Sequence, residues 1–230
     1  MNDQAFDALK TYEWGVDPKT LEPITAAVVA SHGDASARKQ LEKRLTEALG
    51  SDVPRAAKDY VCRQLRSIGT AAAVPALAKL LADEELSHMG RYALERIPAP
   101  EAGAALREAL PKVDGELKIG MISSLGVRGE PASVEPLGKL AGDAEDAVAV
   151  AAAHALGRIA TPAAGRALTA AKVRPATRAA IADALLACAE SLMAAGDKAA
   201  AKAVYQRLGK EKASEPVREA AELGVKACGG

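Results

Sequence analysis

The sequence predicts an all-α protein in which pairs of amphipathic helices repeat along the chain, and three observations carry this prediction. First, alanine, the strongest helix former, makes up about a quarter of the 230 residues, whereas Phe, Trp and Tyr together contribute only 3%. Second, leucines recur in two columns with one common period. Third, no stretch alternates apolar and polar residues as a half-buried strand would.

The two leucine columns define the period. The first column consists of Leu65, Leu94, Leu125 and Leu156. The second consists of Leu77, Leu106, Leu137 and Leu168. In both columns, neighbouring leucines are 29, 31 and 31 residues apart. A fixed period in this range is typical of repeat architectures, in which each repeat is one supersecondary unit stacked on its neighbours.

Each period predicts two helices. The first helix carries apolar residues at helical spacing, as at Ala57, Val61, Leu65 and Ile68. Residues that end or start helices follow it, namely Gly69, Pro98, Gly129 and the Thr161-Pro162 pair. The second helices are short, and we expect them at residues 74–81, 102–110, 134–141 and 163–171.

Outside residues 55–172 the periodicity loosens, but helices are still predicted. Residues 21–31 and 35–49 form an earlier pair. Ahead of it, bulky side chains gather in a segment that we interpret as a cap over the open end of the first repeat, namely Phe6, Leu9, Tyr12 and Trp14. Downstream, a longer helix at 176–195 ends at the turn Gly196-Asp197, and a last helix covers 215–227.

Residues 73–83, with their Val-Pro-x-Leu segment and final Asp83, resemble HEAT repeats. The basic residue that such repeats often place seven positions before the column leucine is present at Lys58 and Lys118 but absent at Ser87 and Ala149. Farther on, the spacing of Leu185, Cys188, Ala189, Leu192, Ala201 and Tyr205 resembles a tetratricopeptide repeat.

The resemblance implies one right-handed α-solenoid of about six HEAT-like hairpins over residues 1–230. We expect a cap at 1–16, HEAT-like repeats at 17–50, 55–83, 86–112, 115–143 and 146–172, a tetratricopeptide-like hairpin at 175–212 and a terminal helix at 215–230.

Catalytic and metal-binding motifs are missing from the sequence. None of His32, His88 and His154 is followed three or four residues later by His, Cys, Asp or Glu, which a helical metal site would need. Deoxyhypusine hydroxylases resemble the chain in architecture, but they use repeated His-Glu pairs as iron ligands, and no His here precedes Glu. The three cysteines fit neither a disulfide framework nor a CxxC motif. We therefore expect no catalytic residue, metal or cofactor.

Charge and hydropathy restrict the class of partner. Thirty Lys and Arg balance thirty Asp and Glu, so no net field attracts nucleic acid or an anionic membrane. We expect a monomer that binds a protein or peptide, acting as a non-enzymatic interaction or scaffolding module with a curved helical surface. The alternative is a subunit or accessory domain of an enzyme, of the HEAT-like lyase or cofactor-handling type. The sequence as written predicts a cytoplasmic protein; removal of a signal peptide would instead indicate a periplasmic or exported one.

The resemblance also implies that the second helices line the binding face. Repeat-equivalent positions there give five candidate protein-binding residues: Lys79, Glu108, Glu135, Lys139 and Arg166. Arginines also recur near the ends of the first helices, at Arg66, Arg96, Arg128 and Arg158. We interpret them mainly as favourable partners of the helix C-termini, with a positive ladder for an acidic partner as the alternative.

Overall fold

The structure is a computed structural model that describes residues 3–210 and 213–229. All regular structure in these residues is helical, which confirms the predicted all-α class. The backbone divides into two compact units, Met1–Val113 and Asp114–Gly230. Residues 1 and 2 of the predicted cap, residues 211 and 212 of the predicted 175–212 hairpin, and residue 230 lie outside the described part.

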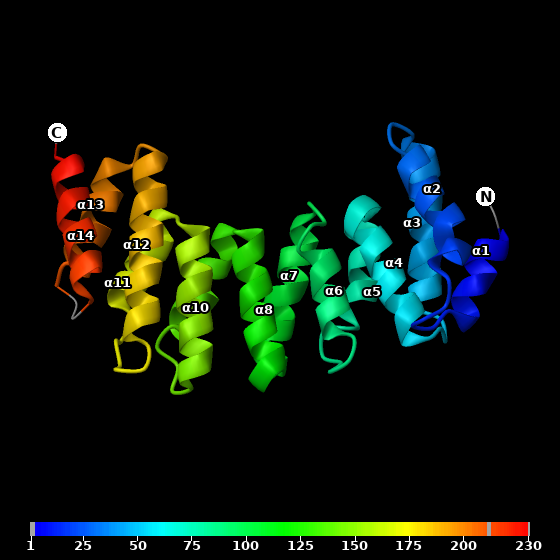
Figure 1. The fold of residues 1–230 in the computed structure, drawn as a ribbon, viewed down its shortest axis with the longest axis horizontal. Helices are drawn as coiled ribbons and strands as arrows, with labels where there is room; N and C mark the ends of the chain where they lie inside the picture. The colour runs from blue at the N-terminus through cyan, green and yellow to red at the C-terminus, as the bar shows by residue number, and fades with distance from the viewer. Residues whose placement is uncertain (1–2, 211–212, 230) are drawn as a thin grey trace. The chain divides into compact units, whose positions relative to one another are not determined.

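The N-terminal unit runs from blue to green in Figure 1. Its α-helices are α1 (Asp3–Ala8), α2 (Glu22–Ala30), α3 (Ala35–Leu49), α4 (Arg55–Ile68), α5 (Val74–Ala78), α6 (Ser87–Leu94) and α7 (Pro100–Ala109). Short 3-10 helices join them at η1 (Leu9–Thr11), η2 (Pro18–Leu21), η3 (Ala71–Ala73) and η4 (Leu110–Lys112). Helices α4 and α6 lie side by side in one layer, α5 and α7 pack against each other in a second layer, and α3 contacts α4 as well as η3 and α5.

The C-terminal unit continues from green to red in Figure 1. Its helices are α8 (Gly115–Arg128), η5 (Pro131–Ser133), α9 (Val134–Leu140), α10 (Asp146–Ile159), α11 (Pro162–Ala170), α12 (Arg178–Ala194), α13 (Lys198–Leu208) and α14 (Glu215–Ala227). The long helices α8, α10 and α12 form one layer, α9, α11 and α13 form the other, and α14 packs on α12 and α13. In the C-terminal unit we call α8, α10 and α12 the long-helix layer and α9, α11 and α13 the short-helix layer. In the N-terminal unit the same names apply to α4 with α6 and to α5 with α7.

The leucine columns form the core between the layers. All eight column leucines have 0% exposed surface. The first column comes from long helices, and the second comes from short helices, so each repeat inserts one leucine from each layer. Full burial of a leucine stabilises the fold by about 1.5–3 kcal/mol, so every repeat gains a comparable stabilisation from its two column leucines.

Residues that break helices separate the two layers where the sequence predicts them. Gly129 ends α8 in the left-handed conformation (φ 69°), which glycine adopts without a steric penalty. Ala160 ends α10 in the same region (φ 49°) despite its Cβ. The next residue, Thr161, accepts a hydrogen bond from the N–H of Ala164 at 3.1 Å and so caps α11.

One repeat departs from the expected pattern. Leu86 lies one repeat after the buried Ala57, so the period predicts a core position for it, but this residue lies in the turn before α6 and is only half-buried. Asp83 holds that turn, because its carboxylate accepts hydrogen bonds from the N–H groups of Glu85 and Leu86 at 2.9 and 3.0 Å. Met89, one turn later, is buried instead.

At the N-terminus, the predicted cap residues differ in exposure. Leu9 is fully buried, and the guanidinium of Arg44 lies 3.9 Å above the ring of Phe6. Tyr12 lies 6.3 Å from Tyr60, measured between ring centroids. Trp14, in contrast, is 60% exposed.

Near the C-terminus, the residues that resemble a tetratricopeptide repeat face inward, because Leu185, Cys188, Ala189, Leu192, Ala201 and Tyr205 are all buried. Asp197 caps α13 by accepting a hydrogen bond from the N–H of Ala200 at 3.0 Å. Among the helices of the described residues, none combines the length and the apolar character that crossing a membrane requires.

Candidate functional site

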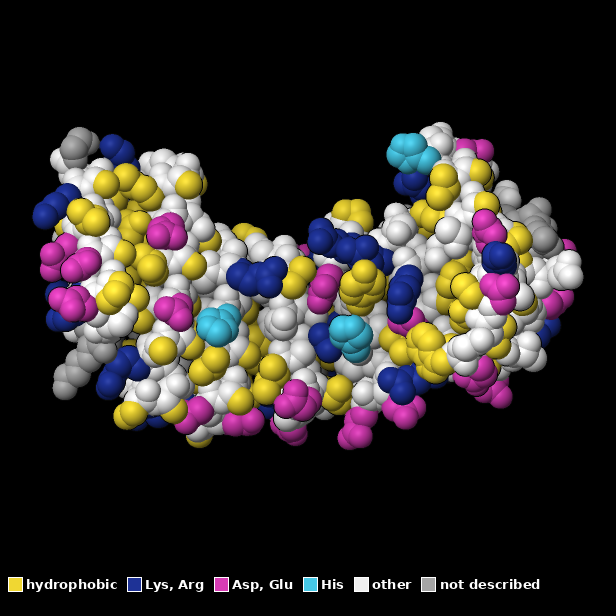
Figure 2. All heavy atoms as spheres, in the orientation of Figure 1, with side chains coloured by type: hydrophobic (Ala, Val, Ile, Leu, Met, Phe, Trp, Pro, Cys, Tyr) yellow, Lys and Arg dark blue, Asp and Glu magenta, His cyan; other side chains and the backbone are white. Residues whose placement is uncertain are grey.

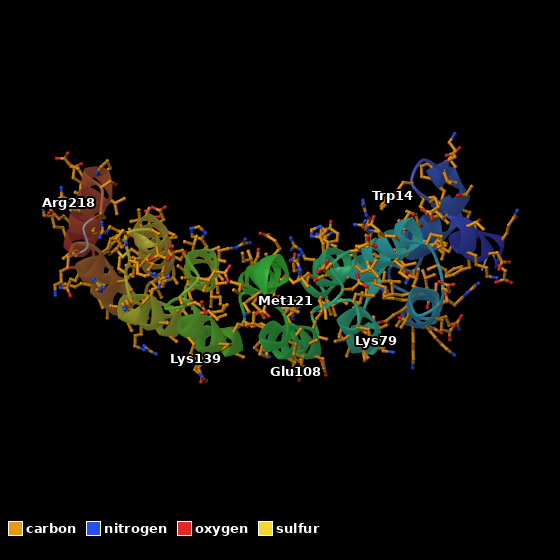
Figure 3. All side chains as sticks on the ribbon, turned by 90° about the horizontal axis from the view of Figure 1, so that it is seen from below. Trp14, Lys79, Glu108, Met121, Lys139 and Arg218 are labelled. Carbon is orange, nitrogen blue, oxygen red and sulfur yellow. The ribbon has the colours of Figure 1, made fainter. Side chains whose placement is uncertain are left out.

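The five residues that the sequence proposes for protein binding all lie on the short-helix layer and are exposed. Lys79 directly follows α5 and Glu108 belongs to α7, both in the N-terminal unit. The other three belong to the C-terminal unit. Figure 3 labels Lys79 and Glu108 on the short-helix layer of the N-terminal unit and, separately, Lys139 on the short-helix layer of the C-terminal unit. Their exposure leaves them available to a partner.

Two of the five residues interact with each other. On α9, the Nζ atom of Lys139 donates a hydrogen bond to Oε1 of Glu135 at 2.9 Å. This hydrogen bond and the lysine charge lower the pKa of Glu135, so the carboxylate is ionised at neutral pH. Because the side chains are 81% and 76% exposed, the pair contributes little to folding, and a partner could separate it at small cost.

A groove of about 450 Å³ runs between α9 and α11, and Glu135 and Lys139 form part of its wall. Besides Val134, its apolar lining consists of residues with one methyl group or none, which we call the floor: Gly138, Gly142, Ala167, Ala170 and Ala171. A Cβ at Gly138 would lie 3.2 Å from the Cβ of Ala167, so the two helices are in close contact. Lys172 adds a second cation to the wall. We call this feature the α9–α11 groove.

The sequence predicts the charged residues Glu135 and Lys139 of the groove but not the glycines and alanines beside them. Gly138 and Ala167 were not proposed, although small residues at facing positions of consecutive second helices were a usable signal. Lys172 follows α11 and was also missed. Arg166 is exposed on α11 but does not line the groove.

Residues 103–186 match the family model of HEAT repeats. This stretch of the chain is therefore identified as HEAT repeats. The matched stretch includes α8 to α11 and therefore the whole α9–α11 groove. The resemblance deduced from the leucine columns and the Val-Pro-x-Leu segment is confirmed.

Solved structures that are similar to this chain share little sequence with it. Human deoxyhypusine hydroxylase in complex with glycerol is 18% identical, with 99% of this chain and 96% of that chain covered and a TM-score of 0.38. Two engineered proteins are 21% and 20% identical; the matches cover 100% and 99% of this chain and 97% and 99% of theirs, with TM-scores of 0.32 and 0.31. No curated protein sequence matches the chain.

Some reactive side chains share a groove, but the described residues contain no metal-binding cluster. Within the described residues, no three His, Cys, Asp or Glu side chains come close enough together to hold a metal ion. His154, Asp183 and Ser191 share a second groove, of about 570 Å³, over α10 and α12. No hydrogen bond joins these three side chains in the described part of the chain, whereas a nucleophile and its base must lie within hydrogen-bonding distance.

The arginines near the ends of the long helices have different surroundings. Arg128 is almost fully buried, and its Nε donates a hydrogen bond to Glu130 at 2.7 Å. That ion pair gives Arg128 a structural role inside the protein. Arg66 instead lies over the ring of Tyr92.

Proposed function

We propose that this protein is a non-enzymatic protein-interaction module and that the α9–α11 groove receives a segment of its partner. The observation that carries the proposal is the groove itself, which combines a floor of Gly and Ala with a charged wall that contains Glu135 and Lys139. Concave, mostly apolar surfaces with a few polar groups are the usual form of binding sites.

The lining of the groove indicates the kind of segment that fits. Because the floor residues have almost no side chain, the backbone of a partner helix or strand can approach closely and place small apolar side chains against them. On the wall, Lys139 and Lys172 outnumber Glu135. The partner segment should therefore carry carboxylates beside its apolar residues, so that electrostatic complementarity favours its orientation.

Photocrosslinking tests this proposal directly. A photoreactive amino acid replaces the exposed Ala170 in the groove, and a matched variant carries it at the exposed Glu190 on α12. Illumination of cells that produce each variant should crosslink a protein through position 170 and not through position 190. Identical products from both positions would contradict the proposal, because they would indicate contact by collision rather than by the groove.

Charge reversal provides the second arm of the experiment. We expect Lys139→Glu to weaken capture of the crosslinked protein about fivefold, because it replaces an attraction to the partner's carboxylates by a repulsion. Adding Lys79→Glu measures whether the short-helix layer of the N-terminal unit also contributes. If the Lys79→Glu and Lys139→Glu double variant captures the partner as well as the wild type does, these residues are not the site.

Elemental analysis separates this function from the rival class of enzyme or cofactor-handling subunit. We expect the purified protein to contain no stoichiometric metal, because no ligand cluster supports one among the described residues. A metal retained at one ion per chain after dialysis would favour the rival class.

A further inference from the structure

The long-helix layer of the N-terminal unit carries a second polar surface, remote in sequence from the α9–α11 groove. His88, Tyr92 and Arg96 follow one another at intervals of four residues along α6 and the turn after it, so they share one helix face. The ring of Tyr92 is stacked with that of His88, with 6.4 Å between centroids and 25° between planes. Arg66 reaches this stripe from α4, with Cζ 4.5 Å from the centroid of Tyr92. We call these four residues the Arg66–Tyr92 patch.

The patch is open to solvent and basic. Tyr92 is 37% exposed, and His88 and Arg96 are exposed as well. Figure 2 shows dark blue basic side chains gathered over α4 and α6, next to a hydrophobic side chain. A large aromatic ring left on the surface among cations is the composition found at the energetic centres of protein interfaces, where Tyr and Arg are enriched.

The carboxylates near the patch do not neutralise its two arginines. Asp59 is engaged by Arg63, at 2.6 Å from Nη2 and 2.8 Å from Nε. Glu95 acts on Arg91, where its charge opposes the lowering of the arginine pKa by burial. In the described part of the chain, neither Arg66 nor Arg96 has a carboxylate within ion-pairing distance. The Nε–H of Arg66 is buried and has no acceptor.

Helix-dipole effects do not account for this arrangement. Arg66 lies in the last turn of α4, where a cation is stabilised by the C-terminal carbonyl groups. That effect explains the position of the charge along the helix, but it does not require an exposed aromatic ring beneath the guanidinium. Stacking fixes the plane of the guanidinium, and a fixed planar donor set is suited to bidentate contact with a carboxylate.

We propose that the Arg66–Tyr92 patch binds a short acidic segment of a protein partner. Carboxylates of the segment pair with Arg66 and Arg96, and a neighbouring apolar or aromatic side chain packs on Tyr92 and His88. A peptide fits better than a nucleic acid, because the patch offers two arginines rather than a long row of cations for phosphates, and the chain as a whole carries no net positive charge. This site is independent of the α9–α11 groove, since all four residues belong to the other unit.

Fluorescence anisotropy on the full chain tests the proposal. The probe is a fluorescein-labelled peptide in which glutamates surround one Trp-Leu pair. A peptide with Gln in place of every Glu and a single-stranded DNA oligonucleotide are the comparison probes. We expect the glutamate peptide to bind at micromolar to millimolar concentration, more tightly than either comparison probe, and binding should weaken when NaCl rises from about 50 to about 500 mM.

Variants locate the binding to the patch. Arg66→Gln should weaken binding of the glutamate peptide about tenfold, and Tyr92→Ala should also weaken it, whereas Tyr92→Phe keeps the ring and should retain binding. Lys112→Gln removes one exposed positive charge from η4 of the same unit and is the matched control; it should change the affinity by less than twofold. Circular dichroism verifies that each variant is folded.

Three results would overturn the proposal. The first is no binding of the glutamate peptide by the wild type at millimolar concentration. The second is an equal loss of affinity in Arg66→Gln and Lys112→Gln, which would indicate attraction by overall charge alone. The third is tighter binding of the DNA, which would assign the patch to nucleic acid. The α9–α11 crosslinking experiment would be unaffected by any of these results, so the two proposals fail separately.

Discussion

Large buried side chains are few in this chain, so each one contributes a large share of the free energy gained by burial. The column leucines are fully buried, whereas most of the other buried positions on α10 and α12 are alanines. Alanine fills little volume, so each leucine contacts many neighbours that cannot expand into the space it would leave. The loss of one leucine should therefore leave a true cavity rather than a collapsed site.

Leu156→Ala tests this expectation. We predict a loss of about 2–5 kcal/mol in the free energy of unfolding, from lost burial plus the residual cavity. Leu223→Ala is the control, because Leu223 lies in the same unit and is 65% exposed; it should change stability by less than about 0.5 kcal/mol. Urea denaturation of the two variants measures both values, and similar midpoints would show that column position does not determine the cost.

The cysteines give a residue-scale prediction about pH. Burial raises the pKa of the Cys62 thiol to about 12 and that of the Cys188 thiol to about 11. Because the thiolate is the reactive form, both groups should be inert at pH 8, and only Cys228, which is half-buried, should react quickly with Ellman's reagent. All three should react in denaturant. A fast reaction that persists in Cys228→Ser would contradict the burial of the other two.

At the scale of elements, the residue after each first-column leucine decides how closely two long helices approach. In the C-terminal unit this residue is Gly126 or Gly157. A Cβ at Gly126 would lie 2.8 Å from the Cα of Ala155, and one at Gly157 would lie 3.0 Å from the Cα of Ala184. In the N-terminal unit the same position holds Glu95 and Arg66, and the side chain of Arg66 ends over Tyr92. The same repeat position thus lies at a close contact between neighbouring long helices in the C-terminal unit and, at Arg66, in the Arg66–Tyr92 patch of the N-terminal unit.

Gly126→Ala tests how much the close contact between α8 and α10 contributes to stability. Alanine is about 1 kcal/mol better than glycine in a helix, yet we predict a net loss of about 1–3 kcal/mol, because α8 and α10 must separate to admit the methyl group. Gly142→Ala is the control, since its Cβ would meet nothing closer than 3.8 Å. Thermal unfolding followed by circular dichroism compares the two. A stabilised Gly126→Ala variant would mean that this contact is not tight.

Some element properties could be predicted and others could not. The start and end of α3 follow from the capping Asp34, which accepts hydrogen bonds from the N–H groups of Ser36 and Ala37, and from Gly50. The early end of α5 at Ala78 and the partial exposure of Leu86 were not predicted. Both depend on how the Asp83 turn returns the chain to α6, and this local hydrogen bonding competes with the apolar periodicity.

On the scale of the whole molecule, each unit contains its own layers and its own column leucines. The N-terminal unit includes Leu65, Leu77, Leu94 and Leu106, and the C-terminal unit includes the other four. In repeat proteins, stability is close to a sum of repeat terms and nearest-neighbour terms, so a unit with several stacked repeats is able to fold without the rest.

Fragments test this inference. We predict that residues 114–230 expressed alone give a helical circular dichroism spectrum and unfold cooperatively. Residues 146–230 are the matched control: they lack α8 and α9, so the face of α10 around Ala155 loses its neighbour. This shorter fragment should be markedly less stable, with a lower urea midpoint. Equal midpoints for both fragments would show that stacking on α8 contributes nothing.

The sequence by itself determined the helical class, the repeat period, the eight core leucines and the helix breaks, because periodicity and helix termination are local properties of the chain. It also determined that Glu135 and Lys139 lie on an exposed face. Only the tertiary structure decided that α9 and α11 leave a groove beside these residues, and that Arg66 meets Tyr92 across two helices. The physical reason is that both features depend on helix-to-helix distances set by non-periodic residues: Gly138 and Ala167 in one unit, and Tyr92, which Ser123 and His154 replace in the following repeats, in the other.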